Sequence, residues 1–141
     1  MTYIKIFIFC LMLCVLGNIG CSDSSSGIGK NSSSCTDFGT GSGYKIKLCV
    51  TNSILPQGGQ TTLIASVKDG QENPVNDSSR GVTFTSTQGA TINADKTINL
   101  GVCSAIYTAP AAATQPSTVV DQIEASYQGA FAHISIQVYK Q

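Results

Sequence analysis

Thiol and imidazole side chains are the first candidates for chemistry in this chain of 141 residues. Cys35, Cys49 and Cys103 are spread over the polar part of the sequence, and His133 is the single histidine. Structural zinc sites need four ligands, usually with closely spaced cysteine pairs, and Cys35, Cys49 and Cys103 contain no such pair. We therefore expect no metal site and no cofactor.

Carboxylates and serines give equally little support for an enzyme. A glycosidase needs two acids on opposed walls of a cleft, but Asp121 and Glu124 are three residues apart and would point to opposite faces of one strand. No Gly-x-Ser-x-Gly motif is present, and His133 falls on the outward side of its expected strand. A small envelope hydrolase is thus the least favoured alternative, and we expect a non-catalytic protein.

An uncharged stretch of 15 residues runs from Ile6 to Gly20, after a start whose only charged side chain is Lys5. Polar residues begin at Ser22. This pattern predicts a secretory signal peptide over residues 1–20. The small residue Gly20 followed by Cys21 resembles a bacterial lipoprotein signal, which implies that Cys21 receives lipid. Ser22 after the cysteine resembles the version sent to an outer membrane.

Two alternatives to lipidation remain open. Ordinary secretion with cleavage nearby would leave Cys21 unmodified. An uncleaved anchor is the other, although 15 apolar residues are short for a membrane-spanning helix, which needs about 20. Asn18 also departs from the lipoprotein pattern, which usually has Leu at that position. Each alternative places the rest of the chain outside the cytoplasm, and we expect the cell envelope as its location.

An odd number of cysteines then remains in an oxidising compartment, so the expectation is one disulfide and one free thiol. We favour Cys35–Cys49 as the disulfide, because a bridge between residues 14 apart would fix the tether to the first strand of the domain. Cys103 is then unpaired, and bridges from Cys103 to either other cysteine stay open as alternatives.

Charge and composition exclude one class of partner. Eight Lys and Arg balance eight Asp and Glu, and charged residues are 11% of the chain. Nucleic-acid binding needs a concentrated basic surface, so we expect no nucleic-acid partner. The many Thr, Ser, Gly, Ala and Val residues favour sheet over helix.

Residues 21–43 contain eight Ser and five Gly, and we expect them to form a flexible tether. From Tyr44 to residue 141, about seven short runs alternate between apolar and polar residues and are separated by turn residues. In the Asp69–Gly70 turn, we expect Asp69 to cap the backbone and Gly70 to take a positive φ. The pattern predicts an antiparallel β-sandwich.

Five motifs in this region resemble bacterial immunoglobulin-like domains of the invasin and intimin type. They occur in the order and at about the spacing of that family, and are residues 55–60, 65–75, 81–85, 105–110 and 123–129. The resemblance implies an immunoglobulin-like sandwich, commonly without a core disulfide. It also implies an adhesin segment, a spacer or an accessory subunit of an envelope assembly.

A protein partner in the envelope is the favoured expectation, beside the membrane reached through the lipid; carbohydrate binding is the alternative. The expected contact patch has two parts. Alternation places Phe131, His133 and Tyr139 on the outward face of the last strand. Lys45 and Lys47 lie outward on the first strand, which we expect at an open edge next to the last strand.

Overall fold

The computed structural model describes residues 32–111 and 117–141. The signal peptide, Cys21 and the first part of the expected tether lie outside this range. The described residues form strands and turns only, and they include no helix long and apolar enough to cross a membrane. The fold is therefore all-β, as the alternating sequence pattern predicts.

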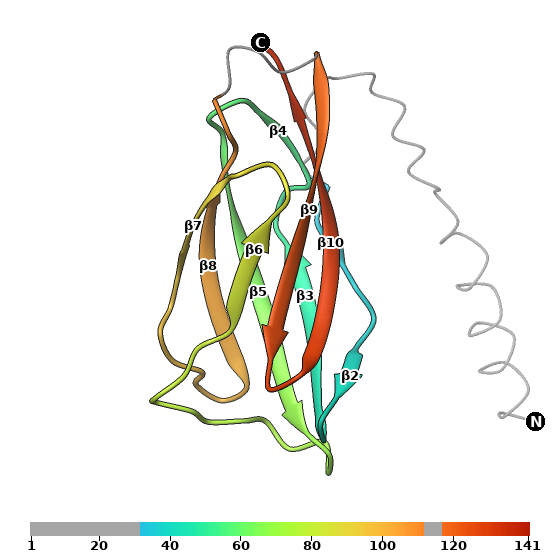
Figure 1. Ribbon diagram of the computed structural model, residues 1–141, viewed down its shortest axis with the longest axis vertical. Helices are drawn as coiled ribbons and strands as arrows, with labels where there is room; N and C mark the ends of the chain where they lie inside the picture. Colours follow the sequence, from blue (N-terminus) through green and yellow to red (C-terminus); the bar gives the residue numbers. More distant parts are fainter. Residues whose placement is uncertain (1–31, 112–116) are drawn as a thin grey trace, which may run out of the picture. The chain divides into compact units, whose positions relative to one another are not determined.

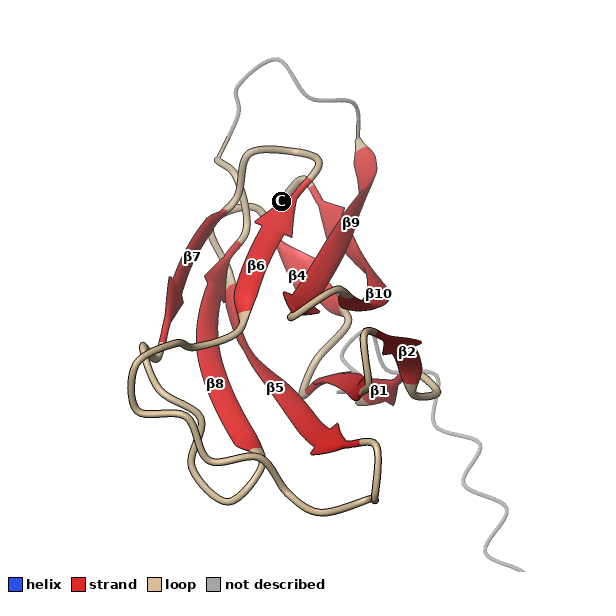
Figure 2. Ribbon diagram, turned by 60° about the horizontal axis from the view of Figure 1, so that its bottom comes forward, coloured by secondary structure: helices blue, strands red, loops and turns tan. Residues whose placement is uncertain are grey.

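Two β-sheets pack face to face (Figure 2). The first sheet has the order β1-β3-β5-β8-β7, with β2 also paired to β3, and the second has the order β4-β10-β9-β6. The strands are β1 Ser34–Cys35, β2 Gly39–Gly41, β3 Tyr44–Val50, β4 Ile54–Pro56, β5 Gln60–Asp69, β6 Thr83–Ser86, β7 Thr91–Ala94, β8 Val102–Thr108, β9 Thr118–Tyr127 and β10 Ala130–Tyr139.

The strand order is that of an immunoglobulin-like sandwich. Strands β3, β5, β8 and β7 stand in the order ABED, and β6, β9 and β10 in the order CFG. These are the seven strands expected from the sequence. Strand β4 is an addition that pairs parallel with the end of β10, whereas the other strand pairs are antiparallel.

Alternation along each long strand builds the core. On β3, Ile46, Leu48 and Val50 are buried, while the residues between them are partly exposed. The same period of two holds on β5, β8, β9 and β10. Because successive strand side chains point to opposite faces, each run contributes one apolar row to the space between the sheets. Burying each large aliphatic side chain contributes about 1.5–3 kcal/mol.

The domain begins earlier than the expected boundary at Tyr44. Strands β1 and β2 belong to the segment that composition assigned to the tether, and both pair with β3. Gly39 and Gly41 explain how so polar a segment is held: a Cβ atom at Gly39 would lie 1.7 Å from the backbone oxygen of Phe131. Glycine thus permits a close backbone approach that no other residue allows. The tether prediction is wrong for these residues.

The two ends of the sandwich differ. Ser32, where the described chain begins, hydrogen-bonds to Ser53 beside the end of β10. The turn from β9 to β10 lies at the opposite end (Figure 1). There the ring of Tyr127 packs edge-on against that of Tyr44. About eight residues of β10 and its turn separate these ends, or roughly 25 Å at the rise of a strand.

Candidate binding surface

The expected contact patch is divided between the two sheets. Phe131 and His133 are exposed on the outer face of β10, and Tyr139 is half-buried at its end. Lys45 and Lys47 instead point out from β3 in the other sheet. The open edge expected for β3 is also wrong, because β1 and β2 pair with that edge. The five residues therefore do not form one surface.

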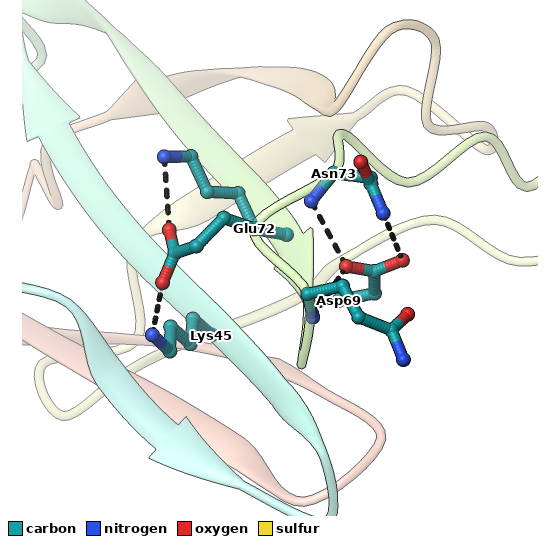
Figure 3. A network of polar contacts seen from close by, with 6 residues as sticks. Lys45, Asp69, Glu72 and Asn73 are labelled. Atoms are coloured by element: carbon teal, nitrogen blue, oxygen red, sulfur yellow. Dashed lines mark hydrogen bonds and ion pairs between the residues drawn. The ribbon is translucent and has the colours of Figure 1, made fainter.

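The lysines on β3 have partners within the domain. Lys45 and Lys68 are cross-strand neighbours, and both contact the carboxylate of Glu72, Lys68 at 3.2 Å (Figure 3). The contact with Lys45 has the larger effect, and together with the contact with Lys68 it lowers the pKa of Glu72. The ammonium groups of Lys47 and Lys68 lie 6.0 and 5.1 Å from the ring centre of Phe38. The lysine ammonium groups on this face are thus engaged with Glu72 and Phe38 of the same domain.

The turn beside these lysines differs from expectation in one detail. Asp69 caps it, accepting hydrogen bonds from the backbone N–H groups of Gln71 and Asn73, each at 2.9 Å (Figure 3). The positive φ falls at Glu72, at 69°, and not at Gly70. The two lysine contacts and the hydrogen bond from the Glu72 N–H to the Asp69 carbonyl hold that conformation.

His133 lies in a polar row on the outer face of the second sheet. Its Nε2 atom is 2.9 Å from a carboxylate oxygen of Glu124, the residue directly opposite on β9. The next outward pair is also bonded, because the Gln122 amide donates to the Ser135 hydroxyl at 2.8 Å. Cross-strand pairs of this kind stabilise a sheet modestly. Both His133 and Glu124 are accessible to solvent.

Phe131 lines a shallow groove that begins where this row ends. The groove has a volume of about 400 Å³, and its other lining side chains include Arg80, Thr83, Ser126 and Gln128. Thr83, Ser126 and Phe131 are consecutive partners across β6, β9 and β10. Among residues 32–111 and 117–141, no ion pair is formed by Arg80. The groove thus joins a cation, hydroxyl groups and an aromatic ring.

Asp77 fixes the loop that carries Arg80. One of its carboxylate oxygens accepts hydrogen bonds from the Ser79 N–H, the Ser79 hydroxyl and the Arg80 N–H, at 2.8–3.0 Å. The other accepts a bond from the Tyr127 hydroxyl at 2.9 Å. The loop is therefore tied to the end of β9. These hydrogen bonds, of which the one from the Ser79 hydroxyl has the largest effect, lower the pKa of Asp77 to about 2.

A pH titration tests this arrangement. A carboxyl group whose pKa is lower in the folded state contributes stability above its unfolded value, near 3.8, and loses it as the pH falls through about 2. We expect the loop to keep the full contribution of Asp77 to its stability down to about pH 4 and to lose it progressively between pH 4 and pH 2. An NMR titration that follows the chemical shift of the Asp77 carboxyl carbon measures the midpoint of its protonation directly. Replacing Ser79 by alanine should raise the midpoint, and a wild-type midpoint near 3.8 would contradict the assignment.

A second carboxylate is buried in the core and is inaccessible to a ligand. Asp121 is fully buried and accepts hydrogen bonds from the Tyr107 hydroxyl at 2.9 Å and the Ser86 hydroxyl at 2.7 Å. The Thr87 hydroxyl and the Gln88 N–H donate to its other oxygen. Burial, and then the bond to Asp121, raise the pKa of Tyr107. This network joins the two sheets and is structural.

The cysteines occupy the places favoured by the sequence. Cys35 and Cys49 form a disulfide between directly paired positions of β1 and β3. Cys103 is a free thiol on the inner face of β8, and burial raises its pKa. A low thiol reactivity follows, because the thiolate is the reactive form. Within the described part of the chain, no three His, Cys, Asp or Glu residues are grouped as metal ligands.

Comparison with known proteins leaves the family open. No family model matches the chain, and no curated protein does. Among solved structures, the chain is similar to domains 4 and 5 of the S-layer protein SbsC, with 15% sequence identity and a TM-score of 0.40. That alignment covers 66% of this chain and 50% of the other, so the chain spans about half the length of that structure. The fold assignment above rests on the strand order alone.

Proposed function

We propose that this protein is a non-catalytic, lipid-anchored binding module of the bacterial cell envelope. The observation that carries the proposal is the groove at the β9–β10 turn. It joins an exposed aromatic ring to the Arg80 guanidinium, which has no acidic partner among the described residues. Several other reactive groups have structural partners: Glu124 for His133, turn amides for Asp69 and Asp77, and core hydroxyls for Asp121. Such an arrangement favours recognition over catalysis.

The resemblance to bacterial immunoglobulin-like domains supports the proposal only through the shared sandwich architecture. Bacterial immunoglobulin-like domains have the same sandwich architecture, and the five motifs of the sequence fall in its strands and turns. A single domain of this size is short for an adhesin stalk. We therefore propose a module that presents one end to a partner, and we keep the outer membrane, suggested by Ser22, as part of the proposal.

The geometry of the domain fits an anchor at Cys21. Ser32 lies at the end of the sandwich opposite the groove, and only residues 22–31 lie between it and Cys21. A Gly/Ser-rich segment of ten residues spans on average about 18 Å. With lipid on Cys21, Ser32 would be the described residue nearest to the anchor along the chain, and the groove lies at the other end of the sandwich.

Metabolic labelling with an alkynyl fatty acid tests the anchor. We expect the wild-type protein to become labelled and to partition with membranes, because Cys21 follows the apolar stretch directly. The Cys21→Ser variant should lose the label, whereas Cys103→Ser should keep it. A wild type that never labels, or a Cys21→Ser variant that still does, would exclude lipidation at this residue.

Crosslinking in intact cells tests the binding role separately. A photoreactive residue at position 128, in the lining of the groove, should crosslink to an envelope component. The same residue at position 140, at the opposite end, serves as the control. Equal crosslinking from both positions would contradict a specific surface at the β9–β10 turn.

A further inference from the structure

We propose that the groove at the β9–β10 turn binds a saccharide that carries a carboxylate group. This inference deepens the proposed role as a binding module, but it does not depend on the lipid anchor. Arg80 is the residue that binds the carboxylate. Phe131 is the platform for the sugar ring.

Arg80 is suited to an anionic ligand. It is the single arginine of the chain, and its side chain is exposed on the groove wall. Its backbone is held by Asp77, yet its guanidinium has no acidic partner among the described residues. A guanidinium can bind both oxygens of a carboxylate with parallel hydrogen bonds, which gives geometric selectivity as well as attraction.

Phe131 and the neighbouring hydroxyl groups are suited to a sugar. Phe131 is 47% exposed and directly opposite Ser126, which in turn pairs with Thr83. This row crosses three strands and spans about 10 Å. The apolar C–H face of a sugar ring can pack on the phenyl ring, while the two hydroxyl groups and the Gln128 amide can bond the sugar hydroxyls. A volume of about 400 Å³ is within the range of small-molecule sites.

A peptide partner fits this position less well. Main-chain pairing would use the free edge of β6, the last strand of this sheet, but Phe131 lies two strands away from that edge on the face of the sheet. Apolar side chains would need deep pockets, whereas the groove offers the exposed ring of Phe131 and a mostly buried Tyr127 among polar groups. The chemistry therefore favours a polar, ring-shaped ligand with one negative charge.

A glycan array with the full-length chain tests the proposal. The chain is produced in bacteria with its own N-terminal segment, purified in detergent and applied to glycans containing uronic acid, sialic acid or neutral sugars only. We expect binding to one or more acidic glycans and at least about ten-fold weaker binding to their neutral counterparts, from the loss of a charge-assisted bond.

Matched variants assign the residues. Arg80→Gln should lower affinity for the acidic glycan by about ten-fold or more. Phe131→Ser should also weaken binding, whereas Phe131→Tyr, which keeps the ring, should retain it. Lys140→Gln removes one positive charge at the opposite end and should have no effect. Circular dichroism of each variant shows that the fold is retained.

Three results would overturn the proposal: no acidic glycan bound, neutral glycans bound equally well, or Arg80→Gln binding like wild type. Crosslinking of position 128 to a protein, with no glycan bound on the array, would also overturn it while leaving the binding role intact. Failure of the specific crosslink would count against the proposed function itself. The two failures are therefore distinguishable.

Discussion

Replacing Asp121 by alanine should lower the free energy of unfolding by about 3 to 5 kcal/mol, the largest effect of any single substitution considered for this domain. The carboxylate lies between the two sheets and accepts four hydrogen bonds. Its removal leaves the buried Tyr107 hydroxyl without an acceptor and opens a cavity. A typical domain is stable by only 5–15 kcal/mol, so a substantial fraction of that stability would be lost.

Urea denaturation at pH 7 measures the effect. Tyr107→Phe removes one donor and should cost less, about 1.5–3 kcal/mol, which is the usual contribution of a bond to a charged group. The double variant Asp121→Ala, Tyr107→Phe should be more stable than the sum of the single effects predicts, because the two residues interact. Glu124→Gln, on the opposite face of the same strand, is the control and should stay within about 0.5 kcal/mol of wild type. Equal stability of the Asp121→Ala and Glu124→Gln variants would contradict the buried network.

The sequence predicted the faces of the strands well because burial in a sandwich follows a period of two. The inward placement of Ile46 and Leu48 and the outward placement of Phe131 and His133 are confirmed by the structure. The same rule could have found Asp121, since it shares a face with Ile123 and Ala125, both buried. As one of two acids close together in the sequence, Asp121 suggests only a catalytic role, and its structural role does not follow from that spacing.

The N-terminal strands could not be found in this way. Strands β1 and β2 have few apolar residues, and their pairing depends on a disulfide and on the small size of Gly39 and Gly41. Composition alone predicted a tether for the same residues. The prediction that Lys45 and Lys47 lie beside an open strand edge is wrong for the same reason, because β1 and β2 occupy that edge of β3.

No local sequence pattern predicts the groove. Arg80 follows a turn, Thr83 begins β6, and Ser126 and Phe131 come from strands more than 40 residues later. Only the register of β6, β9 and β10 brings these residues together. Phe131 is correctly predicted as an exposed aromatic residue beside His133, but the lysines predicted to lie near it are in the other sheet. An isolated arginine in a loop gives no signal by itself.

Replacing both Cys35 and Cys49 by serine should lower the free energy of unfolding by up to about 3 kcal/mol. The disulfide closes a loop over a separation of 14 residues, which limits the conformations of the unfolded chain. It also joins β1 to β3 where the strand pairing itself is only two residues long. Without the crosslink, we expect β1 and β2 to separate from the sheet while the seven main strands stay folded.

Hydrogen exchange locates the change, and peptide mapping without reductant checks the pairing. In the double variant, amides of residues 34–41 should exchange much faster than in wild type, whereas those of β9 and β10 should remain protected. Cys103→Ala removes the buried thiol, and it should leave residues 34–41 protected because Cys103 lies on the inner face of β8. A peptide linking Cys103 to either other cysteine would contradict the pairing, since Cys49 points outward and Cys103 into the core. Unchanged exchange in the double variant would instead mean that the glycine contacts with β10 hold β2 in place without the disulfide.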